Sequence, residues 1–284
     1  MGLMNDPAAP SRARRLLLGS LAALAWPAAA QPTSARRITV GVEAALETSG
    51  LAPRLGRAFQ RDTGLVVDWR SGPSGLLLPQ LERGQLNAAL TQAPDLELAL
   101  AGQHLLHDRR PVARTELVLV GPAPRPARKK NPASGDPAGV AGQRDVLVAL
   151  ARIAAAGERG EAGFVSSGEP SGTQLLEQMM WRALGPRPPG PWRRTAGPGA
   201  AAVLALARET RGYALVERGV WSALGAGSGL AVLVQGDERL AATYHVMRAF
   251  RASHPGGRLL VNWFAGAEGQ RVVAGFGHGY RRVA

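Results

Sequence analysis

The segment from Phe164 to Gln174 carries the residues of this chain that are best suited to chemistry. A short apolar run ends at a pair of serines, and a Ser-Gly-Thr sequence then opens an amphipathic run that extends to Leu184. This pattern predicts a strand, a loop and a helix, in that order. The first N–H groups of a helix have no intrahelical partner and lie at the positive end of the helix dipole. The segment therefore predicts a site that binds an anion.

The side chains of this segment add hydrogen-bond donors to the predicted site. Ser171 and Thr173 carry hydroxyl groups, and Gly172 between them lets a ligand approach the backbone closely. We expect Ser166 and Ser167, at the end of the predicted strand, to face the same ligand. The alternative is structural, because serine and threonine at the start of a helix usually cap it.

The elements that position this segment follow a regular order from Arg37 onward. Short apolar strands alternate with amphipathic helices, which predicts an α/β fold with a mostly parallel sheet and helices on both faces. Ligands of such sheets bind beyond the carboxyl ends of the strands, at the loops that open the next helix. In the first part of the chain the predicted strands are 38–42, 65–69 and 88–91, the helices are 51–63, 74–83 and 94–101, and the loops are 43–49, 70–75 and 92–94.

A strong strand at 115–120 marks the entry into a second lobe. After it, residues 122–142 are rich in proline, arginine, alanine and glycine and have no periodicity, which predicts a surface loop. The pattern then resumes with helices at 145–156 and 199–209, strands at 212–216, 230–234 and 243–248, and helices near 258–265 and 267–276. We expect lobe 1 to comprise 37–119 and 236–284, lobe 2 to comprise 120–235, and the two crossings between them to form a two-strand hinge.

The charge of the chain is weak evidence for a nucleic-acid partner. The formal net charge is +13, but only Lys129 and Lys130 among the 34 basic residues are lysines, which suggests a codon-composition bias as much as a selected surface. No basic run is interleaved with aromatic residues, which make up 5% of the chain. A basic surface can still steer anions toward a cleft. We therefore expect an anionic ligand and no nucleic acid.

The first thirty residues resemble an export signal. Arginines at positions 12, 14 and 15 precede an apolar run to Trp26, and three alanines at 28–30 suit cleavage. The pair Arg14-Arg15 is compatible with the twin-arginine route, and the general secretory route stays open. With no cysteine in the chain, disulfides and a lipid-modified cysteine anchor are excluded. We expect a periplasmic protein, monomeric and cleaved near Ala30.

Taken together, these motifs resemble the tungstate-binding periplasmic proteins of ABC transporters. The resemblance runs from about Arg37 to the end of the chain and rests on Ser49-Gly50-Leu51, Thr63-Gly64, the Ser-Gly-Thr of the central segment and Gly212-Tyr-Ala-Leu-Val-Glu-Arg-Gly219. It implies the type II periplasmic-binding fold, in which two α/β lobes hold an oxyanion in the cleft between them. It also implies a membrane permease as partner and ligand contacts from Ser74, Ser171, Gly172, Thr173 and Arg218.

Two positions depart from the family pattern. The family carries a Thr/Thr/Ser cluster after the first strand, where this chain has Glu43-Ala44-Ala45, and it tends to have an arginine where this chain has Ser167. A carboxylate at Glu43 repels an anion, and the alanines supply no donor. We therefore expect weak binding of tungstate, or a ligand that itself carries a donor for Glu43.

Other functions find less support in the sequence. Ser171 stands one residue too late for a nucleophile elbow, and no lysine follows Gly172 as a phosphate-binding loop would require. We expect no enzyme activity, no cofactor and no metal. For Glu217-Arg218 two readings stay open, a pair that faces the ligand or a solvated ion pair. The alternative function is a ligand-divergent sensor or interaction protein on the same fold, and a hydrolase using Ser171 is the third.

Overall fold

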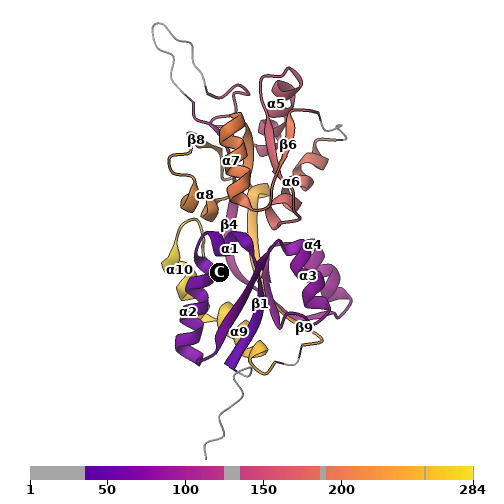
Figure 1. Ribbon diagram of the computed structural model, residues 1–284, viewed down its shortest axis with the longest axis vertical. Helices are drawn as coiled ribbons and strands as arrows, with labels where there is room; N and C mark the ends of the chain where they lie inside the picture. Colours follow the sequence, from indigo (N-terminus) through magenta and orange to yellow (C-terminus); the bar gives the residue numbers. More distant parts are fainter. Residues whose placement is uncertain (1–35, 125–134, 186–189, 253, 284) are drawn as a thin grey trace, which may run out of the picture. The chain divides into compact units, whose positions relative to one another are not determined.

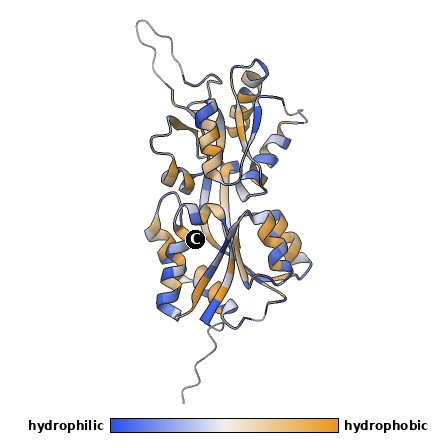
Figure 2. Cartoon of the chain, viewed as in Figure 1, coloured by the Kyte–Doolittle hydropathy of each residue, from blue (hydrophilic) through white to orange (hydrophobic). Residues whose placement is uncertain are grey.

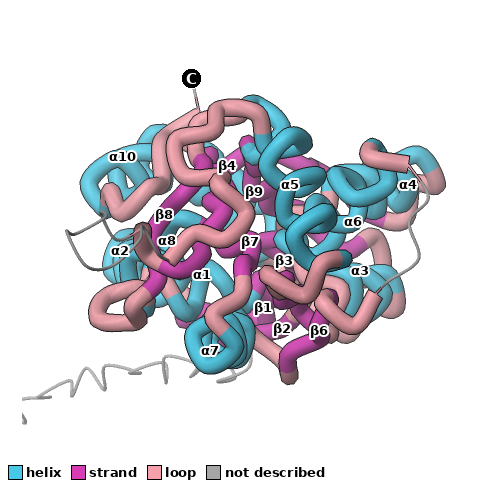
Figure 3. Tube along the Cα trace, turned by 90° about the horizontal axis from the view of Figure 1, so that it is seen from above, coloured by secondary structure: helices cyan, strands magenta, loops and turns pink. Residues whose placement is uncertain are grey.

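The computed structural model describes residues 36–124, 135–185, 190–252 and 254–283, which belong to one compact unit. The predicted export signal at 1–30 lies outside these residues, as does the 125–134 part of the predicted surface loop. The described strands follow the order β2-β1-β3-β9-β4-β7-β5-β6, with β8 paired to β4 beside this path. Seen from above in Figure 3, the strands lie in the middle and helices surround them.

The first group of strands has a parallel core. β1 pairs in parallel with β2 on one side and with β3 on the other, and β9 pairs antiparallel with β3. Alternate residues of a strand point to opposite faces, so β3 places Ala88 and Leu90 in one apolar core and Ala89 in another. Helices cover both faces, as Figure 1 shows. The strands are β1 (Arg37–Glu43), β2 (Val66–Gly72), β3 (Ala88–Thr91) and β9 (Ala241–Ala249), and the helices are α1 (Ala44–Thr48), α2 (Leu51–Thr63), α3 (Ser74–Glu82), α4 (Pro94–Gly102), α9 (Gly256–Ala265) and α10 (Ala267–Phe276).

One long strand, β4 (Leu106–Pro122), belongs to both groups of strands. Its residues up to Glu116 pair with β9, and its residues from Leu117 onward pair with β7 and β8. The second group also has two apolar cores, which Leu117 and Leu119 on one face and Val118 and Val120 on the other help to build. Its elements are α5 (Val146–Glu158), β5 (Phe164–Ser167), α6 (Gly172–Ala183), β6 (Arg193–Ala196), α7 (Ala200–Thr210), β7 (Tyr213–Glu217), α8 (Arg218–Leu224), β8 (Leu230–Val234) and the 3₁₀ turn η2 (Glu238–Leu240).

The helices bury one side and expose the other. In Figure 2 their ribbons carry both hydrophobic and hydrophilic residues, as expected for elements that cover a sheet. On α2, for example, Leu51, Leu55 and Phe59 are fully buried, while Arg61 on the same helix is exposed. The periodicity that predicted these helices therefore reflects burial against the strands.

The α/β class is confirmed, and four local expectations need correction. The predicted loop at 43–49 contains the short helix α1, and β6 and α8 were missed because a four-residue polar strand and a seven-residue helix give almost no periodic signal. β4 begins at Leu106 rather than near 115, because Arg109, Arg110 and Pro111 interrupt its apolar pattern. The sheet is mixed rather than mostly parallel, because β9 pairs antiparallel with β3 and β4 pairs antiparallel with β7, β8 and β9.

Because β4 pairs with strands of both groups, we expect its buried side chains to contribute strongly to the free energy of unfolding. Leu119 is fully buried where β4 meets β7 and β8. We expect Leu119→Ala to lower the free energy of unfolding by about 3 to 5 kcal/mol, because it removes buried methyl groups and leaves a cavity. Leu259→Ala, at a position 46% exposed on α9, is the matched control and should cost less than about 1 kcal/mol. Equal losses in urea denaturation would contradict the burial of β4.

Candidate anion-binding site

The end of β1 and the start of α3 meet at a buried carboxyl group. Glu43, the last residue of β1, is 3% exposed, and Ser74 is the first residue of α3. Oε2 of Glu43 accepts hydrogen bonds from the backbone N–H of Ser74, at 2.8 Å, and from its hydroxyl group. Parallel strands bring their carboxyl ends to one edge, and β1 pairs with β2, which leads into α3. The parallel pairing of β1 and β2 therefore brings Glu43 and Ser74 together.

The start of α6 reaches the same carboxyl oxygen. The N–H of Gly172, the first residue of α6, donates to Oε2 of Glu43 at 3.2 Å. A Cβ atom on Gly172 would lie 2.1 Å from Oε1 of Gln92, so only glycine permits this approach. A second contact joins the same segments, since the N–H of Gly75 donates to the carbonyl of Pro170 at 2.9 Å. Donors from both groups of strands thus converge on one oxygen atom.

A small cavity of about 40 Å³ lies beside this carboxyl group. It is large enough to hold a water molecule. Of the predicted site residues, Glu43, Ser167, Ser171 and Thr173 line it. The lining also includes residues that the sequence did not predict as ligands, namely Ala44, Ala45, Thr48, Glu169, Glu177, Gly199, Ala200, Val203, Leu215, Val216, Glu217 and Val220. Four glutamates and no arginine, lysine or histidine are among the described lining residues.

Three of these glutamates are deeply buried, and burial governs their protonation. Loss of hydration raises the pKa of Glu43 to about 7, although the hydrogen bonds from Ser74 and Gly172 oppose this. Burial likewise raises the pKa of Glu177 and of Glu217 to about 7. The cavity therefore gains negative charge as the pH rises through neutrality.

Glu217 lines the cavity but does not form the predicted pair with Arg218. The side chain is 1% exposed, and its two oxygens accept hydrogen bonds from the hydroxyl groups of Tyr244 and Tyr280. It is neither a solvated ion pair nor a partner of Arg218. Sequence reasoning missed the two tyrosines because they stand 27 and 63 positions later and no motif connects them to Glu217.

Arg218, which the resemblance implies as a ligand contact, is not among the residues that line this cavity. Its Nε donates to Glu116 at 2.7 Å, and its Nη2 donates to Gln235. The other carboxylate oxygen of Glu116 accepts from the N–H of Gly236 at 2.9 Å. Arg218 therefore ties together the two places where the chain crosses between the groups of strands.

The remaining predicted hydroxyl groups serve structural contacts. The hydroxyl of Ser166 donates to Glu177, which also accepts from Nε1 of Trp181 at 3.2 Å. Oγ of Ser171 accepts from the N–H of Gln174 at 3.2 Å and so caps α6, as the structural alternative predicted. Oγ of Ser74 accepts from the N–H of Gln92 at 3.0 Å while it donates to Glu43.

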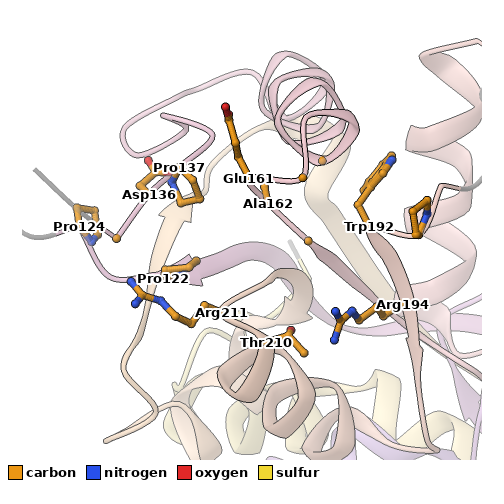
Figure 4. Close-up of a pocket in the computed structure, with 15 residues that line it drawn as sticks. Pro122, Pro124, Asp136, Pro137, Glu161, Ala162, Trp192, Arg194, Thr210 and Arg211 are labelled. Carbon is orange, nitrogen blue, oxygen red and sulfur yellow. The ribbon is translucent and has the colours of Figure 1, made fainter.

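A much larger cavity, of about 810 Å³, lies elsewhere (Figure 4). Figure 4 shows Arg194 and Arg211 among its labelled side chains, with Asp136 and Glu161 on the other side of the opening. Asp136 accepts from the hydroxyl of Tyr213 at 2.6 Å, and Glu161 pairs with Arg159 at 2.7 Å. None of the predicted site residues lines this cavity.

The described residues show neither a membrane-spanning helix nor a metal site. Their helices are each too short or too polar to cross a lipid bilayer. In the same part of the chain, no three His, Cys, Asp or Glu side chains group in a way that would hold a metal ion.

Comparison with known proteins supports the resemblance seen in the sequence. The profile of the PBP superfamily domain matches residues 27–268. A protein of Haloferax volcanii, provisionally named as an ABC transporter anion-binding protein, is 30% identical over 203 residues, which are 72% of this chain and 55% of that protein. The chain thus spans about half the length of this relative.

Two proteins whose names refer to tungstate match over more of their length. The tungstate-binding protein TupA of Peptoclostridium acidaminophilum is 27% identical over 236 residues, covering 81% of this chain and 77% of that protein. The crystal structure of the tungstate ABC transporter from Geobacter sulfurreducens superposes with a TM-score of 0.70 at 28% identity, covering 84% of this chain and 98% of that one.

The buried glutamates predict a pH-dependent stability. Between the ordinary pKa of 4.5 and the folded-state pKa of about 7, the unfolded chain has lost the Glu217 proton while the folded chain keeps it. The free energy of unfolding therefore falls as the pH rises through this window, and glutamine avoids the loss. We expect Glu217→Gln to gain on the order of 2 to 3 kcal/mol relative to the wild type between these two pH values.

Urea denaturation across this pH window measures the difference, and contributions common to both proteins cancel. Glu47→Gln, at an exposed position on α1, is the matched control and should follow the wild type at every pH. A constant offset between Glu217→Gln and the wild type would mean that Glu217 does not titrate in this window.

Proposed function

Because the chain belongs to the PBP superfamily, we propose that it is an extracytoplasmic solute-binding protein that captures a small oxyanion for an ABC importer. The names of its relatives support this: one is an anion-binding protein of an ABC transporter, and two bind or transport tungstate. They favour transport over the sensor or interaction role left open by the sequence. The partners are then a small anion and a membrane permease, and the chain binds its substrate without transforming it.

The convergence of donors on one oxygen is the observation that carries the proposal. The N–H and hydroxyl of Ser74 come from α3, and the N–H of Gly172 comes from the start of α6. Helix-opening N–H groups in a site closed to water bind negatively charged oxygen well, and here they already hold one. The arrangement suits an oxyanion of small size.

We propose two lobes with the boundaries expected from the sequence, 37–119 with 236–284 and 120–235. The change of β4 partners between Glu116 and Leu117 supports the first boundary, and the contact of Gln235 with Arg218 supports the second. Arg218 then acts at the hinge, where its bonds to Glu116 and Gln235 hold both crossings. Closure about such a hinge is a usual movement of two-lobed binding proteins.

For the ligand groups, we propose Ser167, Ser171 and Thr173 together with the Gly172 N–H, since these line or adjoin the cavity. Ser74 contributes through Glu43, and Ser166 supports Glu177 behind the cavity. A dianion meets four carboxyl groups there, so its affinity is lower than in a site with a cation.

The first test is calorimetric titration of the mature protein with tungstate, molybdate, sulfate and phosphate. We expect binding of at least one of these oxyanions, weakened roughly 10- to 100-fold by Thr173→Val, which removes one hydroxyl donor and keeps the side-chain shape. Thr210→Val, at the end of α7, is the control and should bind as the wild type does. Unchanged affinity in Thr173→Val would remove Thr173 from the site.

Export to the periplasm is the second expectation, with the twin-arginine route proposed on Arg14-Arg15. Cell fractionation and N-terminal sequencing should find the mature protein in the periplasm with its start near Ala30. Replacing both arginines by lysine should leave the precursor in the cytoplasm. Normal export of this variant would point to the general secretory route, and a cytoplasmic protein that retains residues 1–30 in the wild type would contradict export.

A further inference from the structure

The oxygen held at the candidate site belongs to the protein itself. The carboxyl of Glu43 is 3% exposed and receives three hydrogen bonds on Oε2, from the N–H and hydroxyl of Ser74 and from the N–H of Gly172. These are the donors that a bound oxyanion would need. While Oε2 of Glu43 accepts these three hydrogen bonds, an oxygen atom of a bound anion cannot occupy the same position.

From this geometry we infer that Glu43 is a tethered competitor of the ligand, a carboxyl group that occupies the position of one oxyanion oxygen and must be displaced for binding. The inference rests on the proposed function and deepens it, because it names the residue that sets oxyanion affinity. Glu43 also joins α3 to the start of α6 across the two groups of strands, so the same contact holds the site closed without a ligand.

The surroundings of Glu43 strengthen the competition. Glu217 on β7 lies close enough to disfavour a second negative charge at Glu43, and Glu169 and Glu177 line the same cavity. An incoming oxyanion therefore meets both an occupied set of donors and repulsion from neighbouring carboxylates. Removing the Glu43 carboxyl frees the donors, lowers the repulsion and joins its volume to the adjacent cavity of about 40 Å³.

Mutations in a binding site usually weaken binding, whereas removal of the Glu43 carboxyl should strengthen it. Glu43→Ala should bind tungstate roughly tenfold or more tightly than the wild type in mildly alkaline buffer, because the three donors are then available to the ligand. Glu43→Gln removes the charge but keeps the group in place, so its gain should be smaller. Glu47→Ala, four residues along the chain and exposed, should bind as the wild type does.

A second measurement tests the occupied position without relying on tungstate. Formate has the same carboxylate as Glu43, so it should bind in the vacated position and raise the melting temperature of Glu43→Ala. The wild type, Glu43→Gln and Glu47→Ala should show no such response relative to chloride at equal ionic strength. If Glu43→Ala does not fold, the tungstate affinity of Glu43→Gln decides, and affinity equal to or below that of the wild type overturns the inference.

The outcomes separate the inference from the proposed function. Tight tungstate binding by the wild type that Glu43→Ala leaves unchanged or weakens overturns the inference and keeps the function. A formate response of Glu43→Ala, with no oxyanion bound by any variant, supports the tethered carboxyl and contradicts oxyanion transport. A Glu43→Ala protein that folds and responds to formate no more than the wild type does overturns the inference.

Discussion

The hydrogen bonds on one carboxyl oxygen of Glu43 are the interaction on which the candidate site depends. They bring the end of β1, the start of α3 and the start of α6 to a single point. A buried carboxyl group without such partners would be costly, whereas here the two backbone N–H groups that reach it open helices and themselves need an acceptor. The same contact satisfies both requirements, which explains why a glutamate is tolerated where an anion-binding site is expected.

The fold is largely predictable from the sequence, because burial produces periodicity. The helices at α2, α6 and α10 and the strand β3 fall close to where the apolar pattern places them. β6 and α8 escape prediction because short elements bury too few residues to show a period. The switch of β4 between two groups of partners was not predicted either, because the polar run at 107–111 hides the first part of this strand and the apolar run at 115–120 reads as a strand of its own.

The site is less predictable, and the reason is distance along the chain. Gly172 at the start of α6 follows from the local Ser-Gly-Thr pattern, whereas its acceptor lies 129 positions away. For Glu43 the sequence indicates an obstacle to an anion, and only the fold shows that this carboxyl accepts hydrogen bonds from Ser74 and Gly172. For Arg218 the resemblance implies a ligand contact, whereas the structure shows its side chain hydrogen-bonded to Glu116 and Gln235.

The continuity of β4 has a mechanical consequence. A strand that runs without a break from one set of partners to the other, paired with β9 up to its change of partners, cannot swivel as a single-bond linker can. Relative motion has to bend and twist a two-stranded ribbon, which is soft in one direction and stiff in the others. For the lobe movement proposed above, such a ribbon would favour bending across its own plane and would keep the two groups of strands in register.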